Sequence, residues 1–118
     1  MKKILVIDDD PSFRRVLEYN LQDEGYDVFC AASGEDGLAL FHEKNPDLVI
    51  TDMKMNGISG LEVLSAAKKN NPAMRVIVVT AFGAADNADT AIKLGAFDYL
   101  TKPIHRNQLK QAVRRAFG

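Results

Sequence analysis

The chain alternates between short apolar runs and longer segments in which apolar residues recur every three or four positions. The apolar runs are Ile4–Ile7, Val28–Ala31, Leu48–Thr51, Val76–Val79 and Phe97–Leu100. Most of them are apolar at nearly every position, which is typical of parallel strands covered on both faces. The pattern therefore predicts five buried strands.

The segments between these runs have the spacing of amphipathic helices. Apolar residues share one helical face in three groups, namely Phe13, Val16, Leu17 and Leu21; Leu61, Leu64 and Ala67; and Leu109, Ala112, Val113 and Ala116. Polar residues mark the expected helix ends. Asp10 before Pro11 is a favourable start. Ser33 and Ser59 each precede an acidic residue by three positions, as in a capping box, and Gly25 suits a helix end.

A strand followed by a helix, repeated along the chain, predicts an α/β fold with a five-stranded parallel sheet and helices on both faces. The chain has 118 residues, of which 47% are hydrophobic and 26% are charged. These values fit one globular domain, so we expect residues 1–118 to form a single doubly wound domain. Ligands of open parallel sheets bind beyond the carboxyl ends of the strands. The residues that directly follow each strand are therefore the candidates for chemistry.

Carboxylates follow two of the predicted strands. Asp8, Asp9 and Asp10 come after the first strand, and Asp52 comes after the third. If these strands are neighbours, the carboxylates converge, and two like charges about 4 Å apart repel by roughly 4 kcal/mol at an effective dielectric near 20. A divalent cation would offset this repulsion, and oxygen ligands suit Mg²⁺. Zinc is disfavoured because the one cysteine, Cys30, has no Cys or His partner, and we expect Cys30 to be a small core hydrophobe.

A hydroxyl and an ammonium group follow two further strands, Thr80 after the fourth and Lys102 after the fifth. A cation and Lys102 would neutralise phosphoryl oxygens, and the Thr80 hydroxyl would donate a hydrogen bond to one of them. Asp52, between the cation and Lys102, is a suitable nucleophile. Taken singly, each residue is as compatible with a helix cap, a turn or a solvated surface. Their joint placement at four strand ends favours a site of phosphoryl transfer.

These residues resemble the receiver domain of two-component response regulators over essentially the whole chain. Five segments carry the resemblance in order, namely Ile4–Asp10, Leu48–Met55, Gly60–Leu64, Val78–Ala81 and Gly95–Pro103. The resemblance implies a flavodoxin-like fold with strand order 2-1-3-4-5. The segments Thr80–Gly83 and Gly95–Leu100 also resemble those of receivers that are fused to sigma-54-dependent transcription activators.

The resemblance implies a role for each acidic residue. Asp52 would accept a phosphoryl group from a phosphohistidine of a sensor histidine kinase or from a small phosphodonor. Asp9, Asp52 and the backbone carbonyl of Lys54 would bind Mg²⁺ directly, and Asp8 would help through water. The protein would not be a dedicated enzyme, but it would catalyse its own Mg²⁺-dependent phosphorylation and autodephosphorylation.

The resemblance also implies which residues would contact the phosphoryl group and change position when it binds. Thr80 and Lys102 would contact the phosphoryl group, and the Lys102–Pro103 peptide bond is expected to be cis. Tyr99 occupies the position of the family's switch aromatic, and it would turn inward as Thr80 moves toward the phosphate. A half-buried strand aromatic is the alternative interpretation of Tyr99.

The chain departs from the family in the loop after Asp52. Asn56–Gly57 stands where the family usually has a proline after its methionine, so the loop is expected to be less rigid. The side chains of Lys54 and Phe82 lie two residues after Asp52 and Thr80. We therefore expect them to approach or shield the phosphoryl group and to set its lifetime.

The expected partner surface is formed by the fourth helix, the fifth strand and the fifth helix, and it would contact an output domain, a target protein or a second copy after phosphorylation. Arg106, Lys110 and Arg114 share one face of the last helix, which would serve docking or dimerisation or simply be solvated. The net charge of −1 gives no general attraction to nucleic acid or anionic membranes. No apolar run can span a bilayer or form a secretory signal, so a cytoplasmic location is expected.

Two other families share part of the pattern. Ile4–Ser12 also resembles the start of a haloacid-dehalogenase phosphatase, in which Asp8 would be the nucleophile and Asp10 the acid/base. That family needs acidic metal ligands after its lysine, residues 104–118 contain none, and Asp52 would have no role. A flavin-binding module would need a phosphate-binding loop after the first strand, where this chain has Asp8, Asp9 and Asp10. A pseudo-receiver, which has the same fold but is never phosphorylated, would not need all of the site residues that are present here. Whether the domain acts alone or within a longer regulator stays open.

Overall fold

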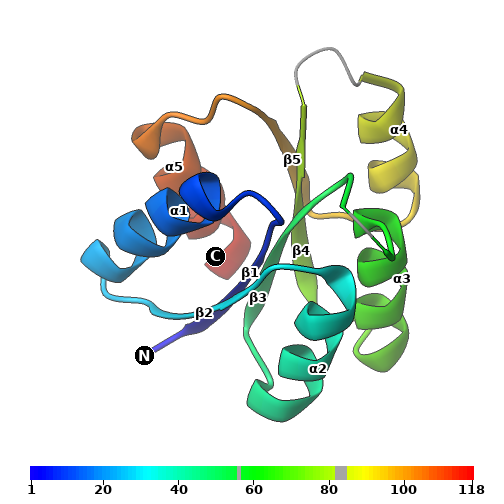
Figure 1. Ribbon diagram of the computed structural model, residues 1–118, viewed down its shortest axis with the longest axis horizontal. Coiled ribbons are helices and arrows are strands. Elements are labelled where there is room, and N and C mark those ends of the chain that lie inside the picture. The colour runs from blue at the N-terminus through cyan, green and yellow to red at the C-terminus, as the bar shows by residue number, and fades with distance from the viewer. Residues whose placement is uncertain (56, 82–84) are drawn as a thin grey trace.

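The computed structural model describes residues 1–55, 57–81 and 85–118 (Figure 1). Its strands are β1 (Lys3–Ile7), β2 (Asp27–Ala31), β3 (Leu48–Asp52), β4 (Arg75–Thr80) and β5 (Asp98–Thr101). Its helices are α1 (Pro11–Asp23), α2 (Gly34–Lys44), α3 (Gly60–Asn70), α4 (Ala85–Lys93) and α5 (Arg106–Phe117). Each strand is followed by a helix, as the hydrophobic pattern predicts.

The strands form one parallel sheet in the order β2-β1-β3-β4-β5, which confirms the expected topology. β1 lies between β2 and β3, where Ile4 pairs with Val28 of β2 and with Leu48 of β3. β3 and β4 each extend one residue beyond the predicted run, because Asp52 pairs with Val79 and Thr80 pairs with Thr101. The side chains of Asp52 and Thr80 are therefore held by the sheet itself.

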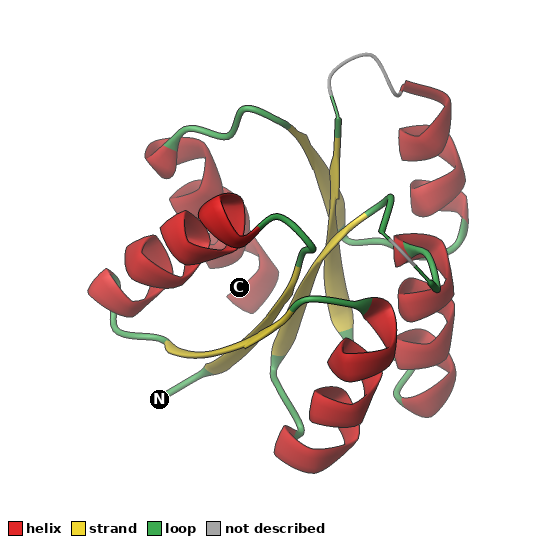
Figure 2. Ribbon diagram, in the orientation of Figure 1, coloured by secondary structure: helices red, strands yellow, loops and turns green. Residues whose placement is uncertain are grey.

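Helices cover both faces of the sheet (Figures 1 and 2). α1 and α5 lie on one face, and α2, α3 and α4 lie on the other. Two hydrophobic cores follow from this arrangement, one on each face. Strand residues alternate between them, so Ile4 and Val6 of β1 pack on the first face and Leu5 and Ile7 on the second.

The start of α1 follows the predicted signals. The Asp10 side chain accepts hydrogen bonds from the backbone N–H groups of Ser12 and Phe13, and Pro11 is the first helical residue. The predicted apolar face is wrong at Val16, which is 54% exposed, whereas Leu17 and Leu21 are buried. Val16 is rotated by about 100° from Leu17 around the helix, and that rotation carries it past the sheet into solvent.

Cys30 is partly buried and packs against the core beneath α1 and α5, as a small hydrophobe should. Its Sγ donates to Oε2 of Glu18 at 3.6 Å. Burial, followed by the nearby Glu18 charge, raises the pKa of the Cys30 thiol to about 12. The thiol therefore stays protonated at neutral pH, and it fills space without being a nucleophile.

The basic residues of α5 face the end of α1. Arg106 pairs with Asp23, and Nζ of Lys110 and Nη2 of Arg114 lie 3.6 and 3.5 Å from Oε1 of Glu24. Each of these three cations therefore has an intramolecular acidic partner, and their use in docking or dimerisation stays a prediction. No helix among the described residues is long and apolar enough to cross a membrane.

Candidate functional site

Three carboxylates meet at the carboxyl edge of the sheet. Asp8 directly follows β1, and Asp52 is the last residue of the neighbouring strand β3. One ligand oxygen from each of Asp8, Asp9 and Asp52 lies within 4.8 Å of the others. Asp8 and Asp52 are buried, and Asp9 is exposed. The sheet thus brings Asp8 and Asp52, which are 44 positions apart in the sequence, into one acidic cluster in which Asp9 is exposed to solvent.

Backbone contacts fix Asp8 in this cluster. Its N–H donates to the carbonyl of Ala31 at 3.1 Å, which continues the β1–β2 pairing by one residue. Its carbonyl accepts a 2.7 Å hydrogen bond from Nη1 of Arg14, and its Oδ1 accepts one of 2.8 Å from the N–H of Asp10. The other oxygen, Oδ2, is buried and accepts no hydrogen bond of good geometry from the described residues.

Lys102 supplies the positive charge at the same edge. Its Nζ lies 3.1 Å from Oδ2 of Asp8, 3.5 Å from Oδ2 of Asp52 and 4.3 Å from the ring centroid of Phe13. Burial alone would lower the pKa of Lys102, but the Asp52 and Asp8 carboxylates together outweigh it and raise that pKa. The ammonium group is therefore firmly protonated and is shared by the two buried carboxylates.

The ionised form of Asp52 is disfavoured despite this lysine. Burial and then the Asp8 charge raise the pKa of the Asp52 carboxyl, and Lys102 offsets only part of that effect. One ammonium group does not fully balance two buried carboxylates and the adjacent Asp9. Binding of a further cation at this site is therefore electrostatically favourable.

The donor set fits Mg²⁺. All three side chains offer carboxylate oxygens, and Oδ2 of Asp8 is buried and lies 3.1 Å from the Lys102 ammonium without a hydrogen bond of good geometry from the described residues. Mg²⁺ prefers a few carboxylates together with carbonyl and water oxygens. Lys54, whose carbonyl is the fourth expected ligand, lies two residues beyond the end of β3, and its side chain is exposed.

The remaining expected residues lie around this cluster. Thr80 is buried at the end of β4, and its carbonyl accepts a 2.9 Å hydrogen bond from the N–H of Lys102. The Lys102–Pro103 peptide bond is cis, the isomer that the resemblance implied. Tyr99 is 40% exposed on β5, which makes it an outward-facing residue in this structure. Phe82 and Asn56 lie outside the described residues.

Two contacts at the site are not among those expected from the sequence. Phe13 is predicted only as a core residue, yet its ring faces the Lys102 ammonium. Arg14 looks like an ordinary helix cation, yet it holds the Asp8 carbonyl. A signal for Arg14 does exist, because a residue one turn after the Asp10 cap can reach back over the preceding loop. The approach of Phe13 to Lys102 depends on how α1 packs beside the end of β5.

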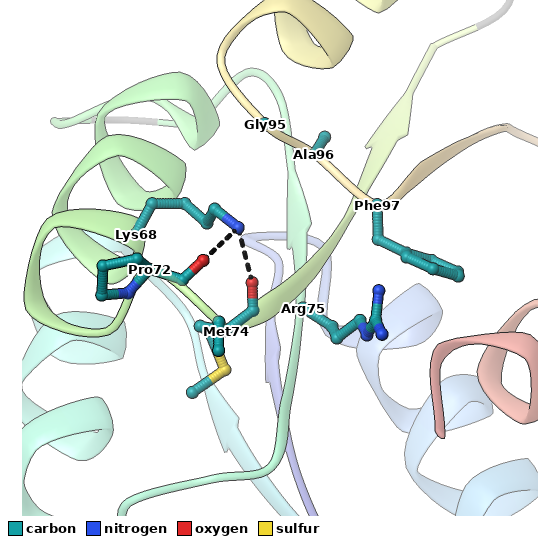
Figure 3. Close-up of a pocket in the computed structure, with 8 residues that line it drawn as sticks. Lys68, Pro72, Met74, Arg75, Gly95, Ala96 and Phe97 are labelled. Carbon is teal, nitrogen blue, oxygen red and sulfur yellow. Dashed lines mark hydrogen bonds between the residues drawn. The ribbon is translucent and has the colours of Figure 1, made fainter. Parts of the chain in front are cut away.

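A separate cavity of about 420 Å³ lies at the opposite, amino edge of the sheet (Figure 3). Nζ of Lys68 donates there to the carbonyls of Pro72 at 2.7 Å and Met74 at 3.2 Å. The guanidinium carbon of Arg75 lies 4.8 Å from the centroid of the Phe97 ring. Lys68 thus ties α3 to the loop that leads into β4, and Arg75 ties the start of β4 to the residue before β5, so both cations have structural contacts.

Comparison with known proteins agrees with this arrangement. The family model described as the response regulator receiver domain matches residues 4–114. The transcriptional regulatory protein GlrR of Escherichia coli is 38% identical over 110 residues, which are 93% of this chain and 25% of GlrR. ZraR of Salmonella typhimurium, also a transcriptional regulatory protein, is 41% identical over 98% of this chain and 26% of its own length. The chain thus spans about a quarter of these curated relatives.

Solved structures are similar over the whole fold. A response regulator receiver domain protein from Clostridium thermocellum has a TM-score of 0.94 and 42% identity, over 98% of this chain and 94% of that one. The receiver domain of NtrX from Brucella abortus has a TM-score of 0.92 and 32% identity, over 96% of each chain.

Proposed function

Because the chain belongs to the response-regulator receiver domain family, we propose that it is a phosphorylation-activated switch of a two-component system and that Asp52 is the phosphoacceptor. One observation carries this proposal. The Asp52 carboxylate lies between an acidic cluster suited to Mg²⁺ and the ammonium group of Lys102, at the open edge of the sheet. Asp8 also lies near Lys102, at 3.1 Å, but its Oδ1 is already bonded to the N–H of Asp10.

The proposed reaction is a nucleophilic displacement at phosphorus. A carboxylate oxygen of Asp52 attacks the phosphoryl group, the O–P bond forms, and the bond from phosphorus to the donor nitrogen or oxygen breaks with its electrons. The donor leaves as a histidine imidazole, which takes up a proton, or as a small carboxylate. Mg²⁺, held by Asp9, Asp52 and the Lys54 carbonyl with Asp8 nearby, would supply charge neutralisation on the phosphoryl oxygens.

The chain's own residues supply the rest of the stabilisation. Lys102 already lies 3.5 Å from Oδ2 of Asp52, so it needs little movement to contact a phosphoryl oxygen there. Thr80 ends the adjacent strand β4, from which its hydroxyl would donate to another oxygen. Lys54 and Phe82 would then control access of water and so the lifetime of the acyl phosphate.

The proposed output runs through α4, β5 and α5. Movement of Thr80 toward the phosphoryl group would make space for the Tyr99 ring, which would turn inward from its exposed position. The apolar side chains of Ile92, near the end of α4, and of Leu94, directly after it, are 47% and 45% exposed. We propose that an output domain, a target protein or a second copy of the domain recognises the change.

The proposed phosphodonor is a sensor histidine kinase. A mostly apolar pocket of about 320 Å³, lined in part by Asp10, Phe13, Val16 and Ile104, adjoins the acidic edge. This surface is suited to a protein that brings a phosphohistidine over Asp52. Similarity to GlrR and ZraR, both named as transcriptional regulatory proteins, supports a role for residues 1–118 as the receiver unit of a cytoplasmic transcription regulator.

Acetyl phosphate tests the proposal without a partner kinase. Incubation with acetyl phosphate and Mg²⁺ should add one phosphoryl group to the protein, as measured by intact mass, and chelation of Mg²⁺ should abolish the gain. Asp52→Asn should not be modified, whereas the control Asp36→Asn, which changes an exposed acid of α2, should react like wild type. Multiple turnover of a phosphomonoester would instead support the dehalogenase-like phosphatase.

A further inference from the structure

The loop after β3 is fastened to the start of α2, a part of the chain that the proposed reaction does not use. Glu35 lies in the first turn of α2, two residues after the N-cap residue Ser33. Its Oε1 accepts a hydrogen bond from the backbone N–H of Ile58 at 3.3 Å. The two residues are 23 positions apart, so the contact joins two separate segments at the acidic edge of the sheet.

Two glycines allow this close approach. Gly57 has a φ of +83°, and a Cβ added there would overlap the Glu35 carboxylate. A Cβ added at Gly34 would overlap the Ile58 side chain and approach its carbonyl at 2.9 Å. The absence of side chains at both positions lets the loop backbone lie directly on the first turn of α2.

The other end of the loop is closed at the strand. The N–H of Gly60 donates to the carbonyl of Met53 at 2.9 Å, and a Cβ on Gly60 would overlap the Asp52 carbonyl. Lys54 lies between this closure and the contact with Glu35. Its backbone is therefore restrained from both sides, although the chain lacks the proline that the family usually has in this loop.

We propose that Glu35 is a positioning residue for the cation site: its carboxylate holds residues 57 and 58 and thereby limits the motion of the Lys54 carbonyl. This inference rests on the proposed function, in which that carbonyl binds Mg²⁺. Glu35 itself does not touch the acidic cluster. Its effect is to reduce the number of loop conformations that are lost when the cation binds.

Three variants separate hydrogen bonding from charge. Glu35→Ala removes the acceptor, and we expect it to weaken Mg²⁺ binding by about tenfold, at the lower end of the effect of outer-shell partners. Glu35→Gln keeps an amide oxygen as acceptor and should restore most of the affinity. Asp36→Asn removes an equivalent charge from the same helical turn, where the Asp36 N–H remains bonded to the Ser33 hydroxyl, and it should bind Mg²⁺ like wild type.

The measurements are the dissociation constant of MgCl₂ by titration calorimetry and amide hydrogen exchange at Ile58 in the metal-free protein. Glu35→Ala should exchange faster at Ile58 and bind Mg²⁺ more weakly, while its melting temperature stays near that of wild type. Unchanged Mg²⁺ affinity in Glu35→Ala, or equal weakening in Asp36→Asn, would overturn the inference. A wild-type protein that binds no Mg²⁺ would instead overturn the proposed function on which the inference rests.

Discussion

At the scale of single residues, the site is defined by an imbalance of charge. Asp8 and Asp52 are buried and share one ammonium group, that of Lys102, while Asp9 adds a third carboxylate at the surface. The raised pKa of Asp52, which is caused first by burial and then by Asp8, is the measurable sign of this imbalance. The same repulsion that favours Mg²⁺ binding should therefore reduce the stability of the metal-free fold.

The substitution Asp52→Asn should stabilise the metal-free protein near pH 7. The folded-state pKa of Asp52 lies above its ordinary value, so the native state binds the proton more tightly than the unfolded chain does. Stability is therefore lost as the pH rises from the ordinary value through the raised one. We expect a gain of about 1 kcal/mol in urea denaturation near pH 7, and a smaller gain near pH 4 or in excess Mg²⁺. A loss of stability near pH 7 would show that Asp52 is not under repulsion.

At the scale of elements, the sequence predicts what depends on local spacing. The strands follow from continuous apolar runs, and the start of α1 follows from Asp10 and Pro11, because these signals involve neighbours along the chain. The rotation of a helix on the sheet is not encoded in that spacing. The hydrophobic pattern therefore does not predict the exposure of Val16, nor the ion pairs between the basic face of α5 and the end of α1. The contact from Glu35 to Ile58 depends on the same kind of packing.

The contacts of Lys68 give a prediction at this scale. Its ammonium group donates to two backbone carbonyls in the loop between α3 and β4, at the edge opposite Asp52 (Figure 3). Lys68→Met leaves those carbonyls without their donor and should cost about 1–2 kcal/mol in urea denaturation. Lys69→Met, which changes the exposed neighbouring lysine, should cost less than about 0.5 kcal/mol. Both variants should be phosphorylated at the wild-type rate, and a slower rate for Lys68→Met alone would link this edge to the site.

At the scale of the whole molecule, the two edges of the parallel sheet carry different residues: the candidate site lies at one edge and structural contacts lie at the other. Its carboxyl edge collects the acids, the hydroxyl and the lysine, and its amino edge carries the Lys68 contacts. The family could be inferred from the order of these residues along the chain, whereas the exposure of Thr80 and Tyr99 could not. In the structure Tyr99 is 40% exposed while Thr80 is buried, a combination that depends on how the chain packs and not on local spacing.

The exposure of Tyr99 should fall when the protein is phosphorylated. Beryllium fluoride, which mimics an acyl phosphate, should draw the Thr80 hydroxyl inward and so open space for the Tyr99 ring. We expect the paramagnetic broadening of its ring signals by a soluble relaxation agent to fall by about half. Thr80→Ala should bind the mimic and leave Tyr99 exposed, and Tyr19, which is 65% exposed, serves as an internal control. An unchanged Tyr99 signal in the wild-type protein would remove its switch role.

The central claim is that Asp52 carries the phosphoryl group. Borohydride reduces an aspartyl phosphate to homoserine, so it marks the acceptor permanently at the position where the acyl phosphate formed. After reaction with acetyl phosphate and Mg²⁺, followed by reduction and peptide mass spectrometry, we expect homoserine at position 52 and nowhere else. Homoserine at Asp8 or Asp9, or a phosphorylated protein that yields none, would contradict it.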